Sequence, residues 1–196
     1  ITLFGIFVLS ILISLLSAII DARVQDVTRG SQPFPFDNHI VILGWSPRLT
    51  AIIEELVIAN ESNKLLRILI LSAKPADELA GLIETAFTDL KTTKLYCRSR
   101  DLCTESSFDN ANLRAARQVL ILGDTSEEIE GSRLKIYLSI RRYLATYNFA
   151  ETQWPEIIVN VDSKDESDII DVASANKVIT VDVSEIPARL IVETVI

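Results

Sequence analysis

The sequence has few of the residues that build most catalytic and metal centres. It contains two cysteines, Cys97 and Cys103, and one histidine, His39. Three such side chains cannot assemble the four-ligand zinc site that proteins usually form, so we interpret both cysteines as ordinary reduced residues. A nucleophile elbow, a P-loop and a paired metal motif are also missing from the sequence. The sequence therefore predicts no enzyme activity.

The sequence also lacks methionine and has no excess of basic residues. The chain has 19 lysines and arginines against 27 aspartates and glutamates, which gives a formal net charge of −8. Because no basic stripe is present, the charge pattern excludes a nucleic-acid partner. Without methionine even the initiator residue is missing, so we expect these 196 residues to be a piece of a longer protein.

Charged side chains are absent from residues 1–20. As a helix this stretch would extend about 30 Å, which matches the hydrocarbon core of a bilayer. A secretory signal peptide would need a basic beginning, a shorter apolar stretch and a small-residue cleavage site. We therefore predict a transmembrane helix over residues 1–20, with a signal peptide or a buried core helix as the alternatives.

The composition changes abruptly after this helix. Four charged residues follow within nine positions: Asp21, Arg23, Asp26 and Arg29. Two prolines, Pro33 and Pro35, then end any helical extension, because proline lacks a backbone donor and clashes with the preceding turn. We assign residues 21–37 to a linker and residues 38–196 to a regulatory domain. The two arginines are typical of a cytoplasmic flank, which predicts an integral membrane protein with a cytosolic domain.

From residue 38 onward, short β-branched runs alternate with amphipathic segments. Parallel strands buried on both faces by crossover helices give this pattern. The predicted strands cover residues 39–43, 67–71, 94–97, 118–122, 156–161 and 178–181. The predicted helices cover residues 47–60, 75–87, 104–111, 127–147 and 164–173. The order predicts an α/β fold with a doubly wound, mostly parallel, Rossmann-like sheet, and ligands outside the carboxyl ends of its strands.

The turn after the first predicted strand is where a dinucleotide would bind in such a fold. It reads GWSPRL at residues 44–49 and keeps one of the three fingerprint glycines. Gly44 can make the tight turn, but Ser46 adds a side chain where the pyrophosphate should approach the backbone, and Trp45 adds bulk. The second strand ends in SAK at residues 72–74, without the carboxylate that would bind the ribose hydroxyls. NAD is therefore not the expected cofactor.

The segment around this turn, residues 39–63, resembles the Castor/Pollux family of cation channels. It reads HIVILGWSPRLTAIIEELVIANESN, and its most specific parts are GWS at 44–46 and IANESN at 58–63. Further similarity lies in CRS at 97–99 and in the apolar stretch that runs into the linker. The resemblance covers nearly the whole chain, and it implies an inner pore helix followed by an RCK/TrkA-N type gating domain.

The resemblance has further implications for assembly. Castor/Pollux channels are similar to calcium-gated potassium channels, in which four subunits form a pore above a gating ring. A homotetramer that conducts a monovalent or divalent cation is thereby implied. A selectivity filter is expected before Ile1, and a second RCK-type domain is expected after Ile196. One departure is at residues 72–75, where the family tends to place an acidic and basic cluster.

Polar residues recur along one face of the predicted membrane helix. Ser10, Ser14, Ser17 and Asp21 are spaced by four, three and four residues, which puts them on one helical face. A polar stripe in a membrane faces protein or water, so these residues are candidates for lining a pore. Serine hydroxyls also bond to the preceding turn and pack at helix contacts, and that alternative remains open.

Candidate ligand residues lie after the first, third and fifth predicted strands. Besides the turn residues Gly44, Trp45 and Ser46, they include Arg98, which could hold an anionic ligand or pair with a carboxylate. Acidic residues that could bind regulatory Ca²⁺ follow the fifth strand: Asp162, Asp165 and Glu166. Their spacing lacks the EF-hand pattern, and a solvated helix start favoured by the helix dipole is the alternative.

Three functions remain possible at this point. The first is a ligand-gated cation channel subunit in which the Rossmann-like domain moves the pore helix through the linker. The second is a membrane-associated regulatory subunit of a cation transporter, without a pore of its own. The third is a membrane-anchored NAD-dependent oxidoreductase, which requires measurable NAD(H) binding despite the depleted turn.

Overall fold

The computed structural model describes residues 32–61, 65–87, 89–124, 132–147, 153–175 and 177–182. Six strands in these ranges form one parallel sheet in the order β3-β2-β1-β4-β5-β6. The strands are β1 (Ile40–Trp45), β2 (Leu66–Ser72), β3 (Thr93–Ser99), β4 (Gln118–Asp124), β5 (Glu156–Val161) and β6 (Ile179–Asp182). The helices are α2 (Leu49–Ala59), α3 (Ala76–Ala86), α4 (Glu105–Asn110), the 3-10 turn η1 (Leu113–Ala115), α5 (Ser132–Thr146) and α6 (Lys164–Ser174).

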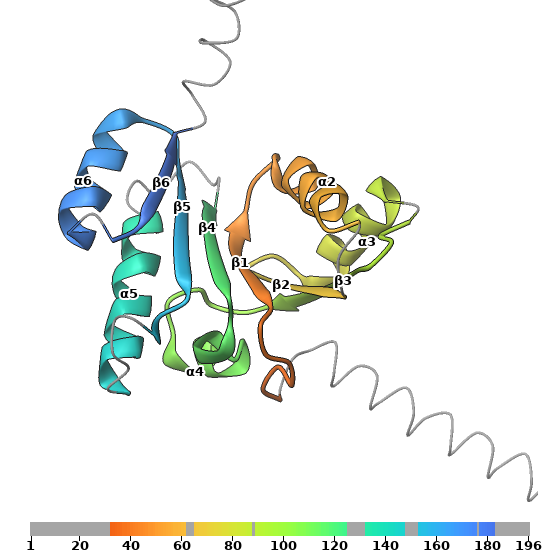
Figure 1. Cartoon of the computed structure of the whole chain (residues 1–196), viewed down its shortest axis with the longest axis horizontal. Coiled ribbons are helices and arrows are strands. Elements are labelled where there is room, and N and C mark those ends of the chain that lie inside the picture. The colour runs from red at the N-terminus through yellow and green to blue at the C-terminus, as the bar shows by residue number, and fades with distance from the viewer. Residues whose placement is uncertain are drawn as a thin grey trace, which may run out of the picture.

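This architecture confirms the predicted doubly wound, Rossmann-like sheet (Figure 1). All six predicted strands are present, and their ends differ from the predicted ends by no more than two residues. The helix predicted over residues 127–147 is described from Ser132 onward, because residues 125–131 lie outside the described ranges. The sequence did not predict η1, since a single turn has no periodicity to detect.

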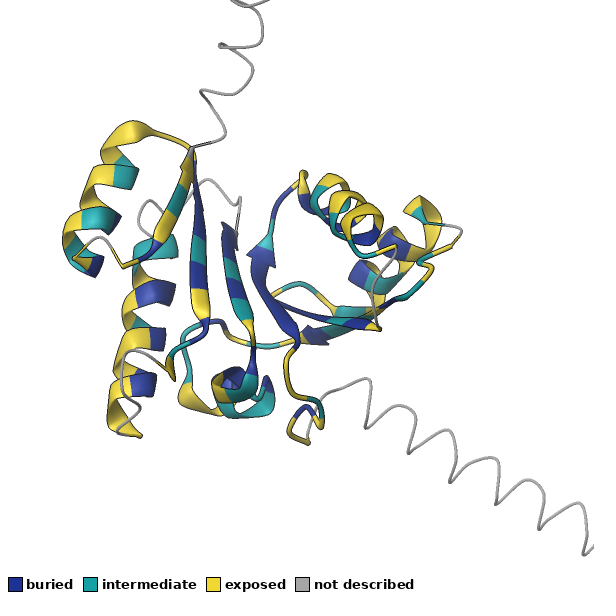
Figure 2. Ribbon diagram, viewed as in Figure 1, coloured by how far each residue is buried: buried dark blue, intermediate teal, exposed yellow. Residues whose placement is uncertain are grey.

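The sheet separates two apolar cores, because alternate side chains of each strand point to opposite faces. Ile40 and Ile42 of β1 pack with α2 and α3, whereas Val41 and Leu43 pack with α4 and α5. Figure 1 shows α2 and α3 on one side of the sheet and α5 and α6 on the other. The central strands are buried on both faces, while the outer surfaces of the helices are exposed (Figure 2). This explains the continuous apolar strand sequences.

The ends of the helices follow local chemical rules. Helix α6 begins after Ser163, whose hydroxyl accepts a hydrogen bond from the amide of Glu166 at 3.2 Å. It ends at Ala175, which has a left-handed backbone with a φ of 53°. Helix α3 begins after Pro75 and carries two acids in its first turn, where the helix dipole favours negative charge.

The predictions for the membrane concern a different part of the chain. The transmembrane helix over residues 1–20, most of the linker and the pore-lining candidates Ser10, Ser14, Ser17 and Asp21 lie outside the described residues. Within the part that the structure describes, no helix is both long enough and apolar enough to cross a bilayer.

Candidate functional site

The strand order defines one place where a ligand crevice is expected. Strand order reverses between β1 and β4, and in open α/β sheets ligands bind beside the carboxyl ends of the strands at this point. Gly44 and Trp45 end β1, Ser46 follows them, and Gly123 lies at the end of β4. The predicted ligand residues Gly44, Trp45 and Ser46 therefore lie at the expected edge of the sheet.

Gly44 and Gly123 face one another across the two central strands. They are paired in the β1–β4 register, which shifts between Leu43 and Gly44, and their φ angles are +99° and +72°. A Cβ atom on Gly44 would lie 2.4 Å from the carbonyl oxygen of Gly123. Glycine is thus required here by the close approach of two backbones and by the positive φ. The sequence interpretation had given Gly44 a role in a tight turn, and the structure adds this contact with Gly123.

Ser46 lies in the turn between β1 and α2, just before the helix begins at Leu49. Its side chain is buried, and its hydroxyl accepts a hydrogen bond from the amide of Arg48 at 3.3 Å. Its carbonyl oxygen accepts a hydrogen bond from the amide of Leu49 at 2.9 Å. Free amides at a helix start are the groups that bind phosphate in dinucleotide sites. Ser46 therefore uses two donors that a pyrophosphate would otherwise meet.

The end of β2 presents a cation to the same edge. The Lys74 ammonium lies 5.0 Å from the centroid of the Trp45 ring and 3.2 Å from a carboxylate oxygen of Glu78. The hydroxyl of Ser72 accepts a hydrogen bond from the Lys74 amide at 3.1 Å. A dinucleotide site has a carboxylate near this position to bind the ribose hydroxyls. The observed lysine instead suits an anionic group.

Arg133 is the site residue that the sequence analysis missed. It extends from the first turn of α5, and its side chain is 12% exposed. Its Nε donates to the carbonyl oxygen of Leu122 at 2.9 Å, and its two terminal nitrogens donate to Glu166 at 2.8 Å and Asp162 at 2.5 Å. Partial burial alone would lower the pKa of Arg133, but the hydrogen bonds to Asp162 and Glu166 hold it above its ordinary value.

Two of the three predicted Ca²⁺ ligands are therefore paired with Arg133. Glu166 is also bonded to the amide of Asp162 at 3.2 Å, which fixes its position at the start of α6. Asp165 is exposed in the first turn of the same helix. No group of three or more His, Cys, Asp or Glu side chains arranged to hold a metal occurs among the described residues. A cation that used both Asp162 and Glu166 would have to displace the guanidinium of Arg133.

Arg98 contacts a different part of the molecule. It is 6% exposed, and one terminal nitrogen donates to the carbonyl oxygens of Gln32 at 2.9 Å and Asn110 at 2.7 Å. Burial, together with the nearby charge of Arg100, lowers its pKa below the ordinary value. The structure thus joins Arg98 to the segment before β1 and to the end of α4, rather than to the turn at residues 44–46.

The only histidine lies where this preceding segment joins β1. His39 is fully buried, and its Nε2 donates to the carbonyl oxygen of Ala111 at 2.9 Å. Its Nδ1 has no hydrogen-bond partner among the described residues. Burial lowers the pKa of His39 below its ordinary value, although the Ala111 hydrogen bond and the charge of Asp37 oppose the shift.

A pH dependence of stability follows from this shift. As the pH falls below 6.5, the unfolded chain binds a proton at His39 more readily than the folded protein does, because burial lowers the pKa of His39 in the folded state. The free energy of unfolding should therefore fall as the pH decreases from 6.5 towards 5, by up to about 1.4 kcal/mol per pH unit. Unfolding in guanidinium at a series of pH values, followed by tryptophan fluorescence, measures this change in the free energy of unfolding. In His39→Gln, whose amide can still donate to Ala111, this slope should disappear; an unchanged slope would assign it to other groups.

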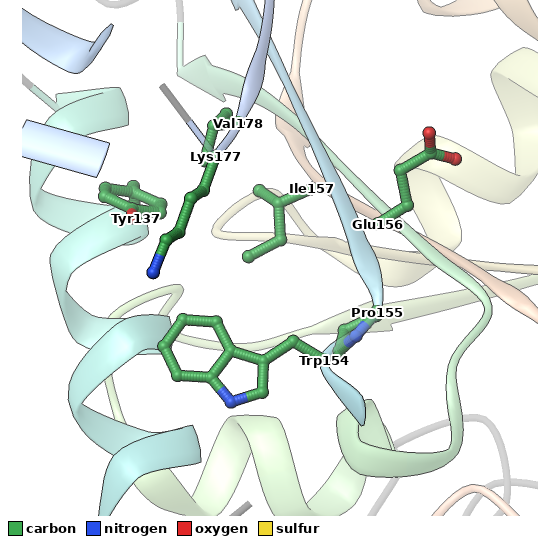
Figure 3. A pocket seen from close by; sticks show the side chains of 7 residues that line it. All are labelled: Tyr137, Trp154, Pro155, Glu156, Ile157, Lys177 and Val178. Atoms are coloured by element: carbon green, nitrogen blue, oxygen red, sulfur yellow. The ribbon is translucent and has the colours of Figure 1, made fainter. Parts of the chain in front are cut away.

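A separate pocket of about 180 Å³ lies near the amino end of β5 (Figure 3). Trp154, Tyr137 and Lys177 approach it from the loop before β5, from α5 and from the segment before β6. The Glu156 side chain points away from the pocket in Figure 3 and accepts a hydrogen bond from Gln118 at 2.6 Å. The volume is below the range of about 300–1,000 Å³ that is typical of ligand pockets, so the pocket is too small for a nucleotide.

Together, the parallel sheet, its strand order and the edge at Gly44 define a Rossmann-like α/β fold. Solved structures share it: the GsuK channel bound to NAD matches with a TM-score of 0.56 at 16% identity, covering 84% of this chain and 25% of that one. The GsuK RCK domain matches with a TM-score of 0.50 at 17% identity, covering 75% and 26%. At these identities the likeness concerns the fold. No protein-family model matches the chain.

Sequence comparison confirms the resemblance to Castor/Pollux ion channels. The chain is 22% identical over 191 residues to the probable ion channel POLLUX of Arabidopsis thaliana and to the ion channel DMI1 of Medicago truncatula. It is 22% identical over 189 residues to the ion channel CASTOR of Lotus japonicus. Each alignment covers 96% of this chain but only 21–22% of the relative, so the chain spans about a fifth of these proteins. The names of these relatives describe ion channels and not enzymes.

Proposed function

We propose that this chain supplies the inner pore helix and the cytosolic gating domain of a ligand-gated cation channel subunit. The observation that carries the proposal is similarity to ion channels over 96% of the chain, in combination with an RCK-type fold. In such an arrangement the sheet domain binds a regulatory ligand, and the segment before β1 transmits its movement. Only a ligand with different affinities for the closed and open arrangements can shift the equilibrium between them.

The division of the chain into three parts belongs to this proposal. Residues 1–20 form the transmembrane helix in the lipid bilayer, residues 21–37 link it to the domain, and residues 38–196 lie in the cytosol. The uncharged composition of the first part supports the assignment. Ser10, Ser14, Ser17 and Asp21 line a water-filled pore for a monovalent or divalent cation. Four copies of the chain assemble around that pore.

Two regulatory ligands have separate support at the carboxyl edge of the sheet. Ca²⁺ is supported by the carboxylates of Asp162, Asp165 and Glu166, provided that it displaces Arg133. NAD is supported by the GsuK channel, which binds it and has the same fold. The local residues fit NAD less well, since Ser46 accepts hydrogen bonds from the amides of Arg48 and Leu49 and Lys74 stands where a ribose carboxylate would be. We therefore rank Ca²⁺ first.

Recording currents from the full-length protein in a planar bilayer tests the channel assignment. With ion substitution, we expect cation-selective currents whose open probability rises with Ca²⁺ on the side of the domain. A response to NADH but not to Ca²⁺ would reverse the ranking of the two ligands. No current, together with a measurable redox turnover with NADH, would instead support the membrane-anchored oxidoreductase. An electrically silent protein that regulates the flux of a separate transporter would support the second alternative.

Cysteine accessibility tests the pore-lining face. In a background without Cys97 and Cys103, Ser14→Cys should react with a water-soluble thiol reagent and lose most of its current, because the face of Ser14 lines the pore. Leu16→Cys is the matched control, since it lies on the opposite face of the same helix turn. Its current should remain within about 20% of the untreated value. Equal inhibition at both positions would contradict the assigned face.

A further inference from the structure

The first described segment of the chain is attached to the domain before it reaches the sheet. This connector, residues 32–39, forms two backbone hydrogen bonds with the region of α4 and η1. The amide of Phe34 donates to the carbonyl oxygen of Asn110 at 2.8 Å, and the amide of Asn38 donates to that of Ala115 at 2.8 Å. The connector is therefore hydrogen-bonded to the region of α4 and η1, in addition to its covalent link to β1.

Aromatic side chains fix the connector against β2 and β3, the two strands at one end of the sheet. Phe34 is 2% exposed, and its ring centroid lies 5.1 Å from that of Tyr96 on β3. Phe36 packs against Phe34 at 5.2 Å, and the guanidinium of Arg67 on β2 lies 4.2 Å from the Phe36 centroid. Such ring contacts are favourable beyond their buried area. The connector thus has a specific position relative to β2 and β3.

Arg98 joins three elements at this place. From β3 it donates to the connector at Gln32 and to α4 at Asn110, and its guanidinium lies 5.5 Å from the Phe34 centroid. Among the described residues no carboxylate forms an ion pair with Arg98. A buried cation that bonds only to carbonyl oxygens is costly unless its position is required. Its bonds hold the far end of the connector, close to where the described chain begins.

We propose that Arg98 is a positioning residue that couples the β3–α4 unit to the chain upstream of Gln32. This inference rests on the proposed function, because it names the contact through which a movement of the domain reaches the pore helix. A shift of β3 or α4 moves the two carbonyl oxygens that Arg98 bonds, and the connector follows. Without the guanidinium, the connector keeps its backbone bonds at Phe34 and Asn38 but loses the bond at Gln32.

Hydrogen exchange on the full-length protein in detergent directly tests whether Arg98 holds the connector in place. In Arg98→Gln we expect peptides that cover residues 32–39 to exchange at least about tenfold faster, while peptides from β1 and β2 exchange as in the wild type. Arg98→Lys should fall between the two, because it keeps the charge and its donors. Arg114→Gln is the matched control: Arg114 is exposed, and its ion pair and ring contact are with Asp109 and Tyr147 rather than with the connector. It should exchange as the wild type does.

A second variant guards against a general loss of folding. Asn112 has a φ of 48°, and its amide donates to the Phe36 carbonyl at 3.1 Å and to Asp37 at 3.2 Å. Asn112→Gly keeps this backbone conformation and removes both bonds, so it should also accelerate exchange of the connector. Equal acceleration of every peptide in Arg98→Gln would overturn the proposed role of Arg98. An unchanged connector in Arg98→Gln would overturn it as well, whatever the result for Asn112→Gly.

Current recordings distinguish a failure of this inference from a failure of the proposed function. If the wild type conducts, Arg98→Gln should shift the Ca²⁺ concentration for half-maximal opening by at least about tenfold with unchanged single-channel conductance, and Arg114→Gln should not. Wild-type gating in an Arg98→Gln protein with a loosened connector would overturn the coupling role. A wild-type protein without current would instead contradict the proposed function. The exchange data would still show whether Arg98 fixes the connector.

Discussion

Gly44→Ala is expected to lower the free energy of unfolding by more than about 3 kcal/mol. Two costs add: a side chain at a φ of +99° is strained, and its Cβ would lie 2.4 Å from the carbonyl oxygen and 2.8 Å from the amide nitrogen of Gly123. Backbone at the centre of a sheet cannot move aside without breaking the β1–β4 pairing. Denaturant unfolding of the chain in detergent, followed by tryptophan fluorescence, measures the loss.

Two other glycines are matched controls for this prediction. A Cβ on Gly123 would meet the side chain of Arg133 at 2.8 Å instead of backbone, so Gly123→Ala, although strained by a φ of +72°, should cost less than Gly44→Ala. A Cβ on Gly81 in α3 meets nothing within 4 Å, so Gly81→Ala should stabilise the protein by about 0.5–1 kcal/mol. A Gly44→Ala protein as stable as the wild type would show that the two strands tolerate wider separation.

Arg133→Gln is expected to cost about 2–3 kcal/mol of stability. The substitution removes the cation between two carboxylates, and Glu166, which is 21% exposed, would keep a charge without its partner. Asp162 is 60% exposed, so water screens much of its electrostatic interaction with Arg133. The loss of stability therefore stays below that expected for a fully buried ion pair. The loss should be smaller in high salt.

A double-mutant cycle identifies the source of this loss. If the uncompensated Glu166 carboxylate is the cause, Arg133→Gln combined with Glu166→Gln should cost about 1–2 kcal/mol less than the sum of the two single variants. Lys74→Gln is the control, because its ion pair with Glu78 is exposed and should contribute less than about 1 kcal/mol. Additive losses at Arg133 and Glu166 would mean that the two side chains act independently.

Much of the fold could be predicted from sequence because strands that are buried on both faces have a recognisable apolar composition. Ile40 to Leu43 and Ile68 to Leu71 are continuous apolar runs, which only a parallel sheet covered on both faces explains. The helix ends were less predictable, since they depend on local hydrogen bonds such as that of Ser163. Nor could periodicity reveal that His39 ends the connector and is not part of β1.

The candidate site was predicted only where neighbours in sequence are also neighbours in space. Asp162 directly follows β5 and Glu166 lies in the first turn of α6, so their proximity followed from spacing alone. Arg133 contacts them from a different helix, 29 and 33 residues away, and no local pattern connects the three. A signal existed in the helix itself: Arg133 precedes Ile136, Tyr137 and Ile140, which places a cation on the buried stripe of α5.

The presence of one imidazole in the chain gives the connector a built-in spectroscopic reporter. Its ring sits between Phe34, 4.8 Å away, and the carbonyl of Ala111, so ring-current shifts and nitrogen chemical shifts both depend on whether that arrangement persists. Selective isotope labelling of histidine would yield a spectrum of this chain with a single site. Two sets of signals in slow exchange would then give the populations of attached and detached connector without any chemical tag.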